Sequence, residues 1–150
     1  AFLEAKAQGY LGVSSKSCKG FYRSLLNRMR VEQWNAATAG GYFMSAEDLT
    51  TQAGIAVQQD LALAALIGLG HIERNGHHYV DGMQGASDTE NAAWLSAHGD
   101  LYADHAGRAR LHIAKGELCL DTVLAAKGLG FAQSAAQATF QTLQSGEKTI

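Results

Sequence analysis

The first 70 residues alternate between short runs typical of β-strands and longer runs in which apolar residues recur at helical spacing. Phe21, Leu25 and Met29 show that spacing in the first long run. Glycines separate the elements, as Gly40 and Gly41 do before the second strand, because glycine readily ends helices and opens turns. The pattern predicts a helix over 1–9, a strand over 10–15, a helix over 19–37, a strand over 41–46 and a helix over 54–70.

Two segments after residue 70 carry turn signals instead of this alternation. An x-Gly pair between two short alternating runs is typical of a β-hairpin, because both central residues of such a turn need a positive φ. The predicted hairpins span 71–82, around Asn75-Gly76, and 110–120, around Lys115-Gly116.

A helix is predicted between the two hairpins. Ser87 followed three residues later by Glu90 forms a capping-box pattern, which marks a helix start, and Gly99 lies near the expected end. The last segment, 132–150, is polar and only weakly periodic, so we expect a helical or frayed tail there.

The β-α-β-α order predicts an α/β fold with a parallel sheet and right-handed crossover helices. Parallel strands normally lie inside larger sheets that are covered on both faces, and two strands do not complete such a sheet. We therefore expect either a second copy or partner, or a place near the end of a longer protein. The expected division is 1–70 for the βαβα segment, 71–131 for the hairpin segment and 132–150 for the tail.

Composition and charge remove several classes of protein. The chain has 150 residues, of which 47% are apolar and 17% charged, so it can build a core. A net charge of −2 with no basic stripe argues against binding to nucleic acid or to an anionic membrane. The longest apolar run, 61–70, is half of what a bilayer span needs, and no signal peptide opens the chain. We expect a cytoplasmic protein.

Cysteine and histidine do not predict a metal site in this chain. Cys18 and Cys119 are far apart and outside any C-x-x-C pair, so we expect two buried thiols and not a disulfide or a zinc site. His77 and His78 are adjacent in a predicted strand, where alternation places them on opposite faces.

Charged residues follow both predicted parallel strands, at the strand ends where α/β proteins place their sites. Lys16 follows the first strand and Glu47 and Asp48 follow the second. A lysine acts as a base only where burial or positive charge lowers its pKa, and Lys19 lies close in sequence. The alternatives are an exposed loop lysine at position 16, and acidic residues at 47 and 48 that only offset a helix dipole.

Four phrases resemble the C-terminal part of enolase-superfamily proteins of the mandelate racemase and muconate cycloisomerase kind. They lie in order between residues 9 and about 131, and Lys127 departs from the family pattern, in which proline is usual there. The phrases are GVSSKSCKGFYRSLLNR, GGYFMSAEDLTTQAGIAVQQDLALAALIGL, RNGHHYVDGM and KGELCLDTVLAAKGLGF.

This resemblance implies the C-terminal part of a (β/α) barrel, with about two βα units, followed by two hairpins and a short helix from the capping region. It implies a lyase or isomerase that removes the proton next to a carboxylate of a small hydroxy acid or sugar acid. Lys16 would be the base or its conjugate acid, and Glu47 an auxiliary catalytic residue at the neighbouring strand end. Lys19, Asp48 and Ser45 are possible auxiliaries.

The same resemblance implies Mg²⁺ as cofactor and a carboxylate substrate as partner. In the family the acidic ligands of the metal precede the lysine strand, so we expect them upstream of this chain and none within it. The chain alone is expected to be inactive without the missing N-terminal barrel portion or a second polypeptide, and the assembly is expected to be a homo-oligomer. The alternative is a non-catalytic βαβα binding or assembly module that dimerisation completes, with the hairpins as contact surface.

Overall fold

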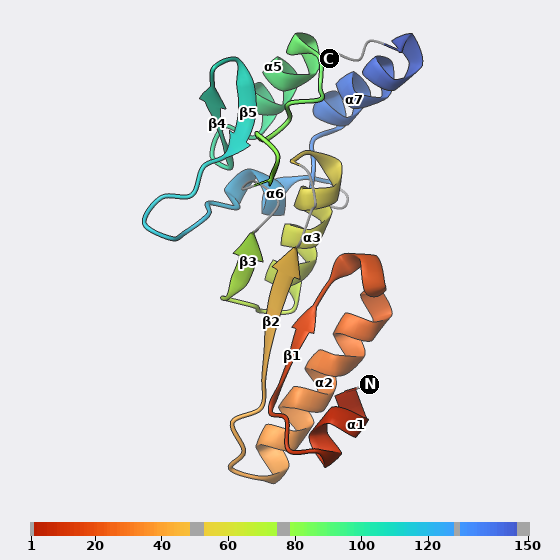
Figure 1. Cartoon of the computed structure of the whole chain (residues 1–150), viewed down its shortest axis with the longest axis vertical. Helices are drawn as coiled ribbons and strands as arrows, with labels where there is room; N and C mark the ends of the chain where they lie inside the picture. Colours follow the sequence, from red (N-terminus) through yellow and green to blue (C-terminus); the bar gives the residue numbers. More distant parts are fainter. Residues whose placement is uncertain (1, 49–52, 75–78, 128–129, 147–150) are drawn as a thin grey trace. The chain divides into compact units, whose positions relative to one another are not determined.

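The computed structural model describes residues 2–48, 53–74, 79–127 and 130–146, excluding the side chain of Asp48. It is a mixed α/β structure with a three-stranded parallel sheet and a two-stranded antiparallel sheet (Figure 1). The chain forms two compact units. The sheet unit comprises Ala1–Asp48 and Leu63–Arg74, and the hairpin unit comprises Leu49–Ala62 and Asn75–Ile150.

The sheet unit confirms the predicted β-α-β-α order and adds a third strand. The strands are parallel in the order β1-β2-β3, with Ser15 opposite Ala46 and Glu47 opposite Glu73. The prediction of two parallel strands was therefore short by one. The elements are α1 (Phe2–Ala7), β1 (Gly12–Ser15), the 3₁₀ turn η1 (Ser17–Lys19), α2 (Phe21–Ala37), β2 (Phe43–Asp48), the end of α3 (Ile55–Leu66) and β3 (Ile72–Arg74).

One face of the sheet carries the core of this unit. Side chains alternate along a strand, so the residues in register on neighbouring strands share a face. Met44 and Ala46 of β2 are buried on this face, and Val13 and Ile72 pack with them. The helices and the turn after α3 add the other buried members of the cluster, which are Phe2, Val31, Leu63, Ala64, Ile67 and Leu69.

The opposite face, which we call the open face, carries polar and exposed side chains. Phe43 is 57% exposed, and its ring lies over Gly12, where a Cβ would overlap it. Further along come Ser14 and Ser45, which are opposite one another in register. The charged residues Lys16, Glu47 and Glu73 lie at the carboxyl end of this face.

The apolar spacing in α2 predicts the helix correctly but does not mark its buried face. Phe21 and Met29 are 40% and 67% exposed. The buried residues are Ser24, Asn27 and Val31. Ser24 contacts the sheet through a 2.8 Å hydrogen bond between its Oγ and that of Ser15. A stripe of apolar side chains on α2 therefore stays exposed.

The predicted apolar helix over 54–70 is confirmed as α3, and its apolar residues supply core positions as expected. Its end is set by Gly68, whose φ of +68° suits glycine and whose N–H bonds to the carbonyl of Ala65. Among the described residues, no helix has the length and apolar character needed to cross a bilayer.

The hairpin unit confirms the predicted helix start at Ser87. Its hydroxyl accepts a 3.2 Å hydrogen bond from the Glu90 N–H. The tail forms a helix up to Ser145, and α5 and α7 lie side by side (Figure 1). The elements are α5 (Asp88–Ala97), β4 (Tyr102–His105), β5 (Arg108–Leu111), α6 (Asp121–Ala125) and α7 (Gln133–Ser145).

The antiparallel ladder lies elsewhere than predicted. β4 and β5 turn at Ala106-Gly107, with φ values of +54° and +81°. Lys115-Gly116 makes the same kind of turn, with φ values of +53° and +82°, but only one isolated bridge closes it. The predicted turn at 75–76 lies outside the described residues, and the Ile72–Arg74 arm before it pairs in parallel with β2.

Buried polar groups bind the hairpin unit together around Trp94 and Tyr102, whose side chains are 0% and 2% exposed. Asn91 accepts a 2.8 Å bond from the Ala109 N–H and donates to the Ser87 carbonyl at 3.1 Å. The helix α5 is thereby fixed to β5.

Cys18 and Cys119 are both exposed, so the expectation of buried thiols was wrong.

His98 fixes a second polar network. The Ala132 N–H donates to His98 Nε2 at 2.9 Å, so that nitrogen carries no proton and Nδ1–H donates to Thr122 Oγ1, also at 2.9 Å. The Thr122 hydroxyl in turn donates to Asp100. His98 therefore joins the end of α5 to α6 and to the start of α7.

Candidate active site

An ion pair joins Lys16 to Glu47 at the carboxyl end of the parallel sheet. The Nζ–Oε1 distance is 2.6 Å, and the side chains are 22% and 28% exposed. The register explains the contact, since Ser15 lies opposite Ala46 and the next residue on each strand is then a neighbour. The structure thus brings together the two residues that the sequence singled out.

The local backbone directs Lys16 to the open face. Its φ of −137° and ψ of 124° continue the extended path of β1, so its side chain points away from the face used by Ser15. The chain then turns through η1 and Gly20, which has a φ of +105°, into α2. Strand, tight turn and helix place the lysine at the sheet edge.

Glu73 joins this group, and the sequence gave no sign of it. It lies opposite Glu47 on β3, so both carboxylates share the open face. Its charge acts on Lys16. A local pattern does not reveal a strand whose partner is 26 positions away, and the Asn75-Gly76 turn signal favoured a hairpin instead.

The carboxylates set the charge of Lys16. The hydrogen bond to Glu47 raises the pKa of Lys16, partial burial opposes this, and the charges of Glu47, Cys18 and Glu73 raise it further. The sequence interpretation required a lowered pKa for a base. In this arrangement Lys16 is instead an ammonium at neutral pH, so its conjugate-acid role is the one that the geometry favours.

The other candidates contribute less to this group. Lys19 is exposed in η1. Ser45 is half-buried on the open face, one step before Glu47 on that face, and in register with Ser14. The Ser14 hydroxyl is buried and has no hydrogen-bond partner among the described residues. The side chain of Asp48 lies outside the described part of the chain.

The residues that the structure describes do not by themselves form a site for Mg²⁺. Within the described ranges, no three His, Cys, Asp or Glu side chains lie close enough together to hold a metal ion. Glu47 is already engaged with Lys16. We therefore assign no metal ligand in this chain and derive no step through a metal.

No protein-family model matches the sequence, and neither a curated protein nor a solved structure matches it. The resemblance to the enolase superfamily thus stays a prediction from the sequence.

Proposed function

We propose that the chain is the C-terminal segment of an enolase-like lyase or isomerase that moves the proton next to a carboxylate of a small hydroxy acid or sugar acid. The observation that carries the proposal is the 2.6 Å contact between Lys16 and Glu47 at the carboxyl ends of adjacent parallel strands. Sites of α/β folds lie at these strand ends. The paired acid and base are what proton transfer requires.

The proposal gives a different part to each side chain. Lys16, held as an ammonium, donates a proton to the substrate and attracts its carboxylate. For the reverse direction, Glu47, which lies within hydrogen-bond reach of the Lys16 nitrogen, accepts a proton from the ammonium, and the amine so formed removes the α-proton and becomes an ammonium again. The Ser14 and Ser45 hydroxyls, beside the pair, suit a substrate hydroxyl.

The proposal places β1, β2 and β3 in a barrel that the remainder of a longer chain or a second polypeptide completes. It takes Mg²⁺ to be held by acidic residues outside this sequence and the protein to be a cytoplasmic homo-oligomer. Two features support the need for completion: the partly exposed open face and the exposed apolar stripe of α2. Parallel strands in complete folds are covered on both faces.

The test is exchange of the α-proton. The intact protein with Mg²⁺ is incubated in D₂O with aldonic acids such as gluconate, and loss of the α-proton signal is followed by ¹H NMR. Lys16→Met is expected to lower the exchange rate by about 10³-fold, the size of a general acid–base contribution. Lys19→Met is the matched control and should retain the rate. Equal rates for Lys16→Met and the unaltered protein contradict the assignment.

The exposed apolar stripe of α2 also favours the second candidate, a non-catalytic module completed by dimerisation. Phe21, Leu26 and Met29 are 40%, 51% and 67% exposed, which is unusual for three large side chains on one helix. Sedimentation of the 150-residue chain separates the candidates. A dimer that Met29→Lys dissociates, without any proton exchange, supports the module, whereas a monomer that needs a further segment for exchange supports the enzyme.

A further inference from the structure

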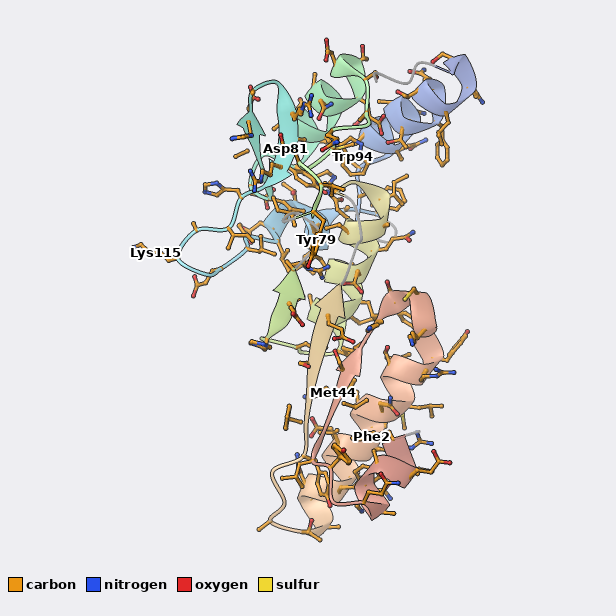
Figure 2. The ribbon with its side chains drawn as sticks, in the orientation of Figure 1. Phe2, Met44, Tyr79, Asp81, Trp94 and Lys115 are labelled. Carbon is orange, nitrogen blue, oxygen red and sulfur yellow. The ribbon has the colours of Figure 1, made fainter. Side chains whose placement is uncertain are left out.

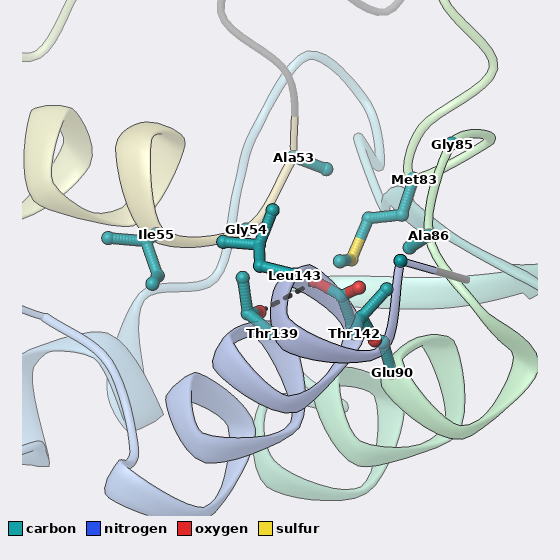
Figure 3. A pocket seen from close by; sticks show the side chains of 11 residues that line it. Ala53, Gly54, Ile55, Met83, Gly85, Ala86, Glu90, Thr139, Thr142 and Leu143 are labelled. Atoms are coloured by element: carbon teal, nitrogen blue, oxygen red, sulfur yellow. Dashed lines mark hydrogen bonds between the residues drawn. The ribbon is translucent and has the colours of Figure 1, made fainter. Parts of the chain in front are cut away.

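A pocket in the hairpin unit shares no lining residue with the group around Lys16. Its volume is about 290 Å³, near the lower end of the roughly 300–1,000 Å³ of small-molecule sites. Figure 3 shows the segment Ala53–Ile55 on one side and Thr139, Thr142 and Leu143 of α7 on the other. Met83 projects between them, and Glu90 of α5 closes one end.

The two threonine hydroxyls of this pocket, those of Thr139 and Thr142, already donate hydrogen bonds within the protein. Thr139 receives the Trp94 Nε1–H at 3.0 Å and donates to Glu90 Oε1 at 2.6 Å. Thr142 donates to the Ala138 carbonyl at 3.1 Å and contacts the Ser87 hydroxyl at 3.0 Å. Two threonines therefore offer a ligand no free proton, and what remains at this end is acceptor capacity.

Glu90 supplies that capacity. It is 6% exposed, yet Thr139 is the only described residue whose side chain bonds its carboxylate, and no described cation pairs with it. Burying a carboxylate with one neutral partner is unfavourable. The N-terminal turn of α5 offsets part of this cost, because its N–H groups carry partial positive charge. A cation with N–H donors would offset the rest.

We propose that this pocket binds a small primary ammonium ligand with a short aliphatic body. The ammonium group donates to Glu90, and the apolar side chains of Ile55, Met83 and Leu143 cover the aliphatic part. The volume has room for a body of at least four carbons, since an engineered cavity of about 150 Å³ binds benzene. An anionic ligand is disfavoured, because Glu90 would repel it and the threonine hydroxyls already donate their hydrogens to other acceptors.

The test uses the full chain, ¹⁵N-labelled, and three probes of the same length: n-butylammonium, n-butanol and butyrate at constant ionic strength. The expected result is a saturable chemical-shift change of the pocket amides with n-butylammonium. Its dissociation constant should be at least about tenfold lower than those of the other two probes, since only the ammonium forms a charge-assisted hydrogen bond with Glu90. Equal affinity for the alcohol and the ammonium, or no saturation, overturns the proposal.

Glu90→Gln is the decisive variant, because Gln keeps the acceptor for Thr139 and removes the charge. It should weaken n-butylammonium binding at least about tenfold, whereas Glu117→Gln, at an exposed acid of the same unit, should not. The Trp94 indole N–H signal reports whether the Thr139 contact survives. Should Glu90→Gln unfold, Ala86→Leu fills the pocket from its wall, and retained binding in that variant contradicts the site.

Discussion

The two units differ in how they treat polar groups. In the hairpin unit, Asn91 and His98 are 2% and 1% exposed, and each bonds to backbone or side chains of other elements. Gln58 is the exception, since it is fully buried without a partner among the described residues. In the sheet unit Ser15 and Ser24 are buried and bond to one another, whereas the charged pair Lys16–Glu47 lies partly exposed on the open face (Figure 2 shows Met44, on the buried side of β2, with Phe2).

This difference indicates two ways of specifying structure. The hairpin unit depends on directional bonds between elements, so its geometry is costly to alter. The sheet unit depends mainly on apolar burial on one face, and it leaves the Lys16–Glu47 pair partly exposed and an apolar helix stripe exposed. Groups that remain exposed are free to meet a substrate or a partner, which is what the proposed site needs. Each unit contains one tryptophan, Trp34 or Trp94, whose indole N–H signal can report its unfolding separately.

The largest expected effect is that of Asn91→Ala. The change leaves the buried Ala109 N–H without an acceptor, so we expect the free energy of unfolding of the hairpin unit to fall by about 3 kcal/mol. Asn35→Ala is the matched change in the sheet unit, where two exposed bonds to Tyr42 are lost, and should cost less than about 1 kcal/mol. Urea titrations that follow both indole signals measure the two values. Equal losses would remove the contrast between the units.

Val31→Ala should follow in size. Val31 is 2% exposed in the sheet-unit core, so losing its methyl groups is expected to cost about 2 kcal/mol. Met29→Ala removes a larger side chain, but one that is 67% exposed, so it should change the free energy of unfolding by no more than about 0.5 kcal/mol. The Trp34 indole signal during urea unfolding provides the measurement. The reverse order would show that the apolar stripe of α2 is covered in solution.

Acid should weaken the hairpin unit through His98. Burial lowers the pKa of His98, against the opposing charge of Asp100. As pH falls, the unfolded chain therefore binds a proton at His98 more readily than the folded chain does. The free energy of unfolding keeps its full value above about pH 6.5, the ordinary histidine pKa, and declines below it by at most about 1.4 kcal/mol per pH unit. His98→Gln should flatten this dependence in the Trp94 urea midpoint between pH 5 and 8, whereas His112→Gln, at an exposed position, should leave it unchanged.

The smallest effect concerns the charge of Lys16. Because the hydrogen bond to Glu47 is the largest cause of its raised pKa, Glu47→Gln should move that pKa down toward the ordinary lysine value. ¹³C NMR titration of the Lys16 side chain measures the change. Glu32→Gln, which removes the i,i+4 partner of Arg28, is the control and should not affect Lys16. An unchanged Lys16 pKa in Glu47→Gln would show that the pair is not formed in solution.

Sequence reasoning succeeded where the signal is local. The Ser87 cap and the paired strands that bring Lys16 to Glu47 both follow from short patterns and from the rule that parallel strand ends meet. It failed where the partner is distant or the residue unusual. β3 bonds to a strand far away in sequence, and the Ala106-Gly107 turn has alanine where asparagine or aspartate is typical.

The helix α7 shows a third limit. Its buried residues are Ala135, Ala136 and Ala138, which are too small to form a clear apolar stripe in the sequence. They allow α7 to lie against α5, where the hydroxyls of Thr139 and Thr142 reach Glu90 and Ser87. The pocket at this contact therefore had no sequence signature, since it arises from small side chains and from pairings about 50 positions apart.

The ring of Phe43 over Gly12 makes these two positions interdependent. Glycine is needed at position 12 to leave space for an aromatic neighbour, because its backbone φ is not among the positive values that favour glycine. A larger residue at 12 requires either that the Phe43 ring, which is 57% exposed, turn away from β1 or that a smaller residue occupy position 43. Paired replacement at positions 12 and 43 is a sign by which diverged copies of this sheet could be recognised.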